Sequence, residues 1–267
     1  ITMPGAVDTW GLTHARFGTM PLTRLLAPAI RYAREGVAVT QDISRWISDD
    51  ADVFRQDPGS AGIFLKNGNA YQPGERLQQA ALGDTLEGIA KNGTRHFYEH
   101  TAHSIVNYLK SQGGLLTLDD FHQYRAKWVQ PISTTYRGFQ AYQVPPPSQG
   151  IAGLMILNFL NGIDLSGLDE NSPEYYNAMI QAIKWAFNKR DQYLTDPEFS
   201  DIPIEELLDP KLANAERAEW LADTKRTHEN RPGGSDTTFI SIADKYGNAD
   251  GLVQSLYFDF GACVTDP

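Results

Sequence analysis

The sequence predicts an α+β protein in which helices come first and strands come last. Before residue 222, most apolar residues recur at the spacing of amphipathic helices. A polar loop rich in Gly and Pro follows at 222–236, and from Thr237 onward the pattern changes to the alternation of β-strands. The change at Thr237 is sharp, so we expect a mainly helical part, 1–236, and a strand part, 237–267.

The helices are predicted from apolar periodicity together with their start and stop signals. Residues 21–36 place leucines, alanines and an isoleucine on one face and end at Gly36. Thr117 is expected to cap a later helix, with Asp119 and Asp120 in its first turn, where negative charge is favourable. The expected helices are 21–36, 76–93, 96–114, 117–124, 150–162 and 172–194.

The strands are predicted from β-branched and aromatic residues that flank turn signals. Residues 132–150 favour a hairpin around Arg137-Gly138, ended by three prolines. Near the end of the chain, a buried strand at 237–244 and a second strand at 250–261 are expected on either side of a turn at 246–248. We expect the single cysteine, Cys263, to pack as a small residue in a strand, where no neighbour would activate its thiol.

Charge and hydropathy exclude several classes of partner. The net charge is −10, from 23 basic and 33 acidic residues, which argues against nucleic acids and anionic lipid surfaces. The longest strongly apolar stretch, 151–160, is about half the length of a membrane span. A small-molecule substrate or a neutral protein partner is therefore expected. The chain starts at Ile1 and not at methionine, so we also expect it to be part of a longer protein.

No metal or cofactor is predicted. His96, His100 and His103 share a helical face and could suggest zinc, but an ordinary half-solvated helix face is favoured. The adjacent Asp119 and Asp120 do not face each other, so helix capping is favoured over paired-carboxylate chemistry. No glycine-rich phosphate loop follows a strand.

Thr237 is a candidate nucleophile because of its position at the start of a strand. A threonine hydroxyl needs a base beside it, and a cut between Asp236 and Thr237 would create one, since the new α-amine titrates at about pH 7.7–8.0. The same hydroxyl could make the cut by attacking the Asp236 carbonyl. The preceding Gly-Gly-Ser-Asp leader is loose enough to let the peptide bend.

Four ordered segments resemble the γ-glutamyltransferase family of N-terminal nucleophile hydrolases. They are MPGAVDTWGLTHARFGTMPLTRLLAPAIRYAREG (3–36), FYEHTAHSIVNYLKSQGGLLTLDDFHQY (97–124), YRGFQAYQVPPPSQG (136–150) and TTFISIADKYGN (237–248). The resemblance implies an αββα sandwich, truncated here at both ends, and a precursor that cleaves itself into a large and a small subunit. It implies that the large subunit ends at Asp236 and that Thr237 is the nucleophile, acting on γ-glutamyl amides such as glutathione and passing the acyl group to water or an acceptor amine.

The resemblance also assigns roles to three further residues. Ser255 stands where the family usually has a threonine that positions the nucleophile, and it keeps the hydroxyl. Tyr257 stands where many members have an asparagine that contacts the substrate's α-amino end, and a phenol has no carbonyl oxygen to offer there. Ser148 lies in the segment that lines the edge of the active-site groove, although the following residues differ from the common Ser-Ser-Gly-Gly.

The departures at Tyr257 and after Ser148 keep two other interpretations open. One is an acylase-like relative that hydrolyses a glutaryl or aliphatic amide, and the other is an uncleaved, inactive scaffold. The family pattern places a carboxylate-binding arginine before residue 1 and glycine oxyanion donors after residue 267, so we do not expect these 267 residues alone to be a competent enzyme. The resemblance suggests a periplasmic or secreted protein, but the sequence leaves the compartment unassigned.

Overall fold

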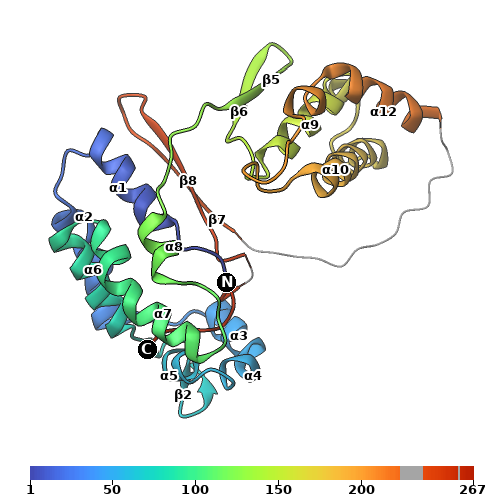
Figure 1. Ribbon diagram of the computed structural model, residues 1–267. Helices are drawn as coiled ribbons and strands as arrows, with labels where there is room; N and C mark the ends of the chain where they lie inside the picture. The colour runs from blue at the N-terminus through green and yellow to red at the C-terminus, as the bar shows by residue number, and fades with distance from the viewer. Residues whose placement is uncertain (223–236, 258) are drawn as a thin grey trace. The chain divides into compact units, whose positions relative to one another are not determined.

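The computed structural model describes residues 1–222, 237–257 and 259–267, and it divides the chain into two compact units (Figure 1). Unit 1 comprises 1–127 and 232–267, and unit 2 comprises 128–231. The strand part after Thr237 therefore belongs with the first half of the chain. The expected cleavage boundary between Asp236 and Thr237 is a different division, and it stays a prediction.

Unit 1 is mainly helical. Helices α2 and α6 lie side by side, and Arg34 bridges them through Asp84 at 2.6 Å and Glu87 at 2.9 Å (Figure 1). The helices of unit 1 are α1 (Ala6–Phe17), α2 (Leu22–Glu35), α3 (Gln41–Asp49), α4 (Ala51–Phe54), α5 (Pro58–Phe64), α6 (Ala80–Asn92), the π-helix Phe97–Thr101, α7 (Ala102–Ser111) and α8 (Leu118–Gln123).

The helices expected in this unit are present, with one error. Residues 76–79 were predicted to begin a helix, but Arg76–Leu77 forms strand β4, which pairs with β1 (Val37–Ala38). A further short pair joins β2 (Leu65–Lys66) to β3 (Asn69–Ala70). The prediction at 76–79 was wrong because strand pairing across about forty residues overrode the local helical periodicity.

The capping prediction for α8 is confirmed. The Thr117 side chain accepts a hydrogen bond from the Asp120 N–H, and the Asp120 carboxylate accepts one from the Thr117 N–H at 2.7 Å. These bonds from the Thr117 backbone and hydroxyl lower the pKa of the Asp120 carboxyl group. Asp120 is therefore a cap and not a member of a catalytic carboxylate pair.

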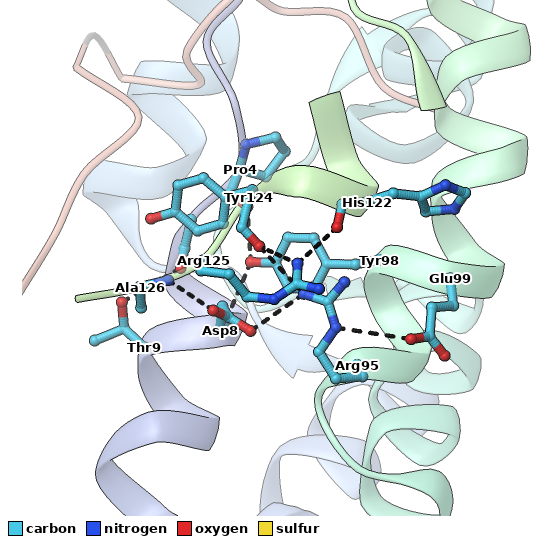
Figure 2. A network of polar contacts seen from close by, with 11 residues as sticks. Pro4, Asp8, Thr9, Arg95, Tyr98, Glu99, His122, Tyr124, Arg125 and Ala126 are labelled. Atoms are coloured by element: carbon cyan, nitrogen blue, oxygen red, sulfur yellow. Dashed lines mark hydrogen bonds and ion pairs between the residues drawn. The ribbon is translucent and has the colours of Figure 1, made fainter. Parts of the chain in front are cut away.

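A polar network joins the start of α1 to the π-helix and to the chain that follows α8 (Figure 2). The Asp8 carboxylate accepts hydrogen bonds from the Ala126 N–H at 2.7 Å and from Arg95 Nη1 at 3.4 Å. The hydroxyl of the fully buried Tyr98 accepts from the Asp8 N–H and donates to the Pro4 carbonyl at 2.8 Å. Burial raises the pKa of Tyr98 to about 12, so its phenol stays a neutral donor.

Unit 2 combines a hairpin with helices, and the hairpin prediction is confirmed. Strand β5 (Ile132–Tyr136) pairs antiparallel with β6 (Phe139–Gln143), and Arg137 and Gly138 both have the positive φ of a tight turn. Its helices are α9 (Gly150–Leu160), the 3₁₀ helix Leu165–Gly167, α10 (Pro173–Tyr193), α11 (Ile204–Leu207) and α12 (Pro210–Ala222). These helices confirm the predictions at 150–162 and 172–194.

One buried polar side chain joins three elements of unit 2. Asn158, on α9, is 4% exposed. Its Oδ1 accepts from the Thr134 hydroxyl on β5, and its Nδ2 donates to the Leu208 carbonyl after α11 at 2.9 Å. Since both partners would otherwise be left unpaired, Asn158 fixes how α9 lies on the hairpin.

The last hairpin pairs β7 (Thr238–Ala243) with β8 (Ala249–Gln254) (Figure 1). Strand β8 was predicted to continue to residue 261, but it ends at Gln254, because Tyr257 and Cys263 take left-handed backbone conformations that cannot continue a strand. The prediction that the first of these strands is buried is also wrong for the described residues. Phe239 and Ile242 are 63% and 61% exposed, and every residue of β7 is exposed.

The mixture of helices and strands confirms the α+β class. The described residues form four two-stranded antiparallel sheets: β1–β4, β2–β3, β5–β6 and β7–β8. The two stacked sheets of an αββα sandwich are not complete within them, so that finer architecture remains a proposal.

We expect Asn158→Ala to lower the free energy of unfolding of unit 2 by about 2 kcal/mol, because it leaves the Thr134 hydroxyl and the Leu208 carbonyl buried without a partner. Urea unfolding followed by tryptophan fluorescence measures the change. Asn177→Ala is the matched control, since Asn177 is exposed on α10 and its loss should cost less than about 0.5 kcal/mol. Equal effects of the two variants would contradict this role for Asn158.

Candidate functional site

The structure brings together two of the predicted site residues, Thr237 and Ser255. Thr238 pairs with Gln254, so the next residue on each side, Thr237 and Ser255, also lie across from each other. The Thr237 hydroxyl donates a hydrogen bond to Ser255 Oγ at 3.3 Å, across 18 positions of sequence. The Tyr257 N–H donates to the same oxygen at 2.9 Å.

The turn between β7 and β8 fixes this register. The Asp244 carboxylate accepts from the Tyr246 N–H at 2.8 Å and from the Asn248 N–H at 3.0 Å, and its other oxygen accepts from Asn248 Nδ2. Gly247 has a φ of +87°, which favours glycine. The predicted turn at 246–248 is thus confirmed. A slip of one residue would turn Thr237 away from Ser255.

The Thr237–Ser255 pair orients a hydroxyl but does not supply a base. Ser255 accepts the Thr237 proton in a hydrogen bond, while its own hydroxyl is far too weak a base to remove that proton at neutral pH. The α-amine that would do so forms only if the bond before Thr237 is cut. Asp236, the predicted last residue before the cut, lies outside the described residues.

Tyr257 is held in an unusual backbone conformation. Its φ is +80°, which is strained for a residue with a bulky side chain, and its side chain is 74% exposed. The backbone of Tyr257 contacts Ser255, whereas the phenol reaches outward from the hairpin. Strain of this kind is often found where a side chain must be presented to a ligand.

Ser148 lies in unit 2, and its described contacts are those of a turn. Its hydroxyl accepts from the Gly150 N–H at 3.2 Å, and its own N–H donates to the Pro145 carbonyl at 3.3 Å. Both bonds form the turn that leads into α9. Its assignment to the site stays a prediction.

The segment after β8 returns to the core of unit 1, which the sequence did not suggest. The ring of Phe260 lies 5.0 Å from the rings of both Phe54 and Phe64, which are themselves 5.0 Å apart. Cys263 packs beside them at 6% exposure, so its predicted packing role is confirmed, but it occupies a turn with a φ of +52° and not a strand. Burial, followed by the nearby carboxylate of Asp50, raises the pKa of its thiol, which makes it a poor nucleophile.

A polar cluster at the start of α5 holds the same segment. The buried Asp57 carboxylate accepts from the Ser60 N–H at 2.7 Å, the Tyr108 hydroxyl at 2.6 Å and the Thr265 N–H at 3.0 Å. Ser60, fully buried, donates to the Cys263 carbonyl at 2.8 Å. Sequence reasoning missed this cluster because its partners are about two hundred residues apart. The only local signal was Asp57-Pro58, typical of a helix start.

The three histidines are not gathered into one group. The rings of His96 and His100 lie 4.6 Å apart, while the ring of His103 lies beside His122 at 6.4 Å. Among the described residues, no group of three or more His, Cys, Asp or Glu side chains is placed to hold a metal ion. Within the same residues, no helix is both long and apolar enough to cross a membrane.

Comparisons with known proteins place these features in a class of hydrolase and acylase precursors. The chain is 42% identical to the glutathione hydrolase-like YwrD proenzyme of Bacillus subtilis over 266 residues, which are 99% of this chain and 50% of that protein. It is 35% identical to the acylase ACY 1 proenzyme of Pseudomonas sp. strain V22 over 272 residues, which are 100% of this chain and 49% of the relative.

The solved structure of a cephalosporin acylase from Bacillus halodurans matches with a TM-score of 0.87 at 31% identity, over 100% of this chain and 50% of that one. The Gamma-glutamyltranspeptidase family model matches residues 1–267, and the chain belongs to that family. The resemblance found in the sequence is confirmed. The chain spans about half the length of the curated relatives it matches.

Asp57 gives the contact with residues 263–265 a defined pH dependence. Desolvation alone would raise the pKa of its carboxyl group, but the hydrogen bonds from Tyr108, Thr265 and Ser60 outweigh it and lower the pKa. A group with a lowered folded pKa contributes stability above its unfolded pKa of about 3.9, and that contribution is lost as the pH falls through the folded value.

We therefore expect the urea midpoint of the wild type to exceed that of Asp57→Asn by a constant amount above about pH 5, and the gap to narrow below about pH 4. Comparing the two proteins at each pH removes the contribution of carboxyl groups that titrate alike in both. A ¹³C titration of the Asp57 carboxyl group checks the direction of the shift independently. A gap that stays constant down to pH 2 would contradict the assignment.

Proposed function

We propose that the whole protein is an autoprocessing threonine hydrolase and acyltransferase that cleaves γ-glutamyl amides such as glutathione. The observation that carries the proposal is the contact between the Thr237 and Ser255 hydroxyls at the start of β7, in a chain that matches the γ-glutamyltranspeptidase family throughout. Relatives named as glutathione hydrolase and acylase proenzymes support both the chemistry and the processing.

Processing begins with the Thr237 hydroxyl. Its oxygen attacks the Asp236 carbonyl carbon, the peptide C–N bond breaks, and the proton passes to the departing nitrogen, leaving an ester on Thr237. The Thr237 α-amine is free once the C–N bond has broken, and water then hydrolyses the ester, which gives residue 236 a carboxylate and restores the Thr237 hydroxyl. The products are a large subunit that ends at Asp236 and a small subunit that starts at Thr237.

Turnover uses the same oxygen with its new base. The α-amine accepts the hydroxyl proton as Thr237 Oγ attacks the acyl carbon of the substrate amide. The proton then passes to the leaving amine, and an acyl ester remains on Thr237. Water or an acceptor amine attacks this ester and restores the hydroxyl. Ser255 acts as a positioning residue that orients Thr237 Oγ before each attack.

The exposed apolar side chains of β7 and β8 favour the sandwich architecture. Phe239, Ile242 and Val253 are each more than half exposed, although alternation of this kind is typical of strands with covered faces. We propose that the hairpin is part of an αββα sandwich that is completed by residues beyond this chain. No cofactor is needed for the chemistry proposed.

Tyr257 favours one alternative substrate class. Its exposed phenol stands where the family pattern has an amide, and a relative of 35% identity is named as an acylase. A hydrolase for glutaryl or aliphatic amides would use Thr237 in the same way and differ only in how the acyl end is recognised.

We expect the purified full-length protein to contain two polypeptides, the second starting at Thr237, and Thr237→Ala to remain a single chain. Intact-mass spectrometry and N-terminal sequencing measure this directly. Thr237→Ser is the control, because it keeps the hydroxyl and should still yield two chains. A folded wild type that remains intact would exclude the mechanism and favour an inactive scaffold.

The substrate class is tested with a γ-glutamyl anilide and a glutaryl anilide. We expect the wild type to show the higher kcat/KM for the γ-glutamyl compound, and Tyr257→Asn to raise that preference further, by about tenfold, because an amide can bond the α-amino end. Tyr257→Phe controls for loss of the hydroxyl alone. Higher kcat/KM for the glutaryl compound would instead support the acylase.

A further inference from the structure

We propose that the cluster of Asp57, Gly59 and Ser60 at the start of α5, here called the α5 anchor, is a positioning site for the segment that carries Ser255 and Tyr257. The inference rests on the proposed function. By holding residues 263–265, the α5 anchor fixes the end of the hairpin that carries Ser255 and Tyr257, and it adds to the Asp244 turn in keeping Ser255 beside Thr237, both in the precursor and after cleavage.

The α5 anchor is buried and bonded to both sides of the proposed cut. Asp57 and Ser60 are 5% and 0% exposed. Asp57 Oδ2 accepts from the Thr265 N–H at 3.0 Å, and Ser60 Oγ lies 2.8 Å from both the Cys263 carbonyl oxygen and the Thr265 hydroxyl. These bonds join 1–236 to 237–267 without any covalent link, so they would persist after cleavage at Thr237.

The backbones approach so closely that only glycine fits at position 59. A Cβ on Gly59 would lie 1.7 Å from the Thr265 carbonyl oxygen, which is less than any real contact. The obstacle is backbone and not the end of a flexible side chain, so it cannot move aside without shifting the segment. Gly62, in the same helix, has open space where its Cβ would be.

Most of the described residues of the strand part are exposed. Residues 237–251 and 253–257 are exposed, and Leu252 is partly covered. Phe260 is partly buried against the rings of Phe54 and Phe64, and Cys263, three residues later, is buried. The anchored residues therefore lie only a few positions after Tyr257, whose N–H donates a hydrogen bond to Ser255. A displacement of residues 263–265 should therefore disturb this hydrogen bond.

A role in folding alone would predict something different. If the α5 anchor only stabilised unit 1, variants in it would lower the amount or the stability of the folded protein but leave the kcat of the folded fraction unchanged. If it positions the site, kcat falls in protein that is still folded, while KM changes little, because the substrate-binding groups are not altered directly.

Two matched pairs of variants in the full-length protein separate these roles. Gly59→Ala introduces a methyl group that clashes with the Thr265 carbonyl oxygen. Gly62→Ala adds the same methyl group to the same helix at a position with open space. Ser60→Ala removes two hydrogen bonds to the segment, one to the Cys263 carbonyl and one with the Thr265 hydroxyl. Tyr108→Phe removes the hydrogen bonds of the Tyr108 hydroxyl to Asp57 and from the Gly59 N–H, but none to the segment. The measurements are kcat and KM with a γ-glutamyl anilide, hydrogen exchange of a peptide covering 259–267, and the thermal midpoint.

We expect Gly59→Ala to lower kcat at least tenfold with KM within about threefold, and to speed exchange in 259–267, while Gly62→Ala matches the wild type. Ser60→Ala should also lower kcat and speed exchange in 259–267, but by less than Gly59→Ala does. Its effect on kcat should be larger than that of Tyr108→Phe. If Gly59→Ala speeds hydrogen exchange in residues 259–267 but keeps the wild-type kcat, the positioning role is overturned. If the wild type itself shows neither cleavage nor turnover, the proposed function fails, and the positioning role fails with it even where exchange shows an intact anchor.

Discussion

The antiparallel register of β7 and β8 is the constraint on which the candidate site depends. Thr237 and Ser255 are 18 residues apart, and only this register brings their hydroxyls within hydrogen-bond distance. The register is fixed locally by the Asp244 turn at one end of the hairpin. At the other end, the left-handed backbone of Tyr257 ends the extended strand, and the chain after it packs beside Phe54 and Phe64.

Elsewhere in the molecule, buried polar side chains also hold together elements that are far apart in sequence. Asp8 joins the beginning of α1 to the chain that leaves α8, and Asn158 joins α9 to a strand and to the end of another helix. In each case one side chain satisfies groups from elements far apart in sequence. Such groups are costly to bury unless every bond is made, so they select one arrangement of the helices over its alternatives.

The sequence predicted best what depends on neighbouring residues. The cap of α8 at Thr117, the turn at Arg137-Gly138 and the turn before Asn248 are all local, and all are confirmed. Arg76–Leu77 could not be read correctly, because a partner strand decides its conformation. Likewise nothing near Asp57 indicates that Thr265 is its partner. The pairing of Thr237 with Ser255 was expected only through the family resemblance, since apolar alternation does not specify register.

The burial of Cys263 makes the chain convenient for spectroscopy. Its thiol is the only one in these 267 residues, and it is shielded beside Phe54 with a raised pKa. A maleimide dye applied at neutral pH should leave Cys263 unlabelled. It should react with a cysteine introduced at an exposed position such as Tyr246, at the tip of the last hairpin. A fluorophore at that tip could then report on the surroundings of the hairpin before and after the proposed cleavage, without first having to remove the thiol of Cys263.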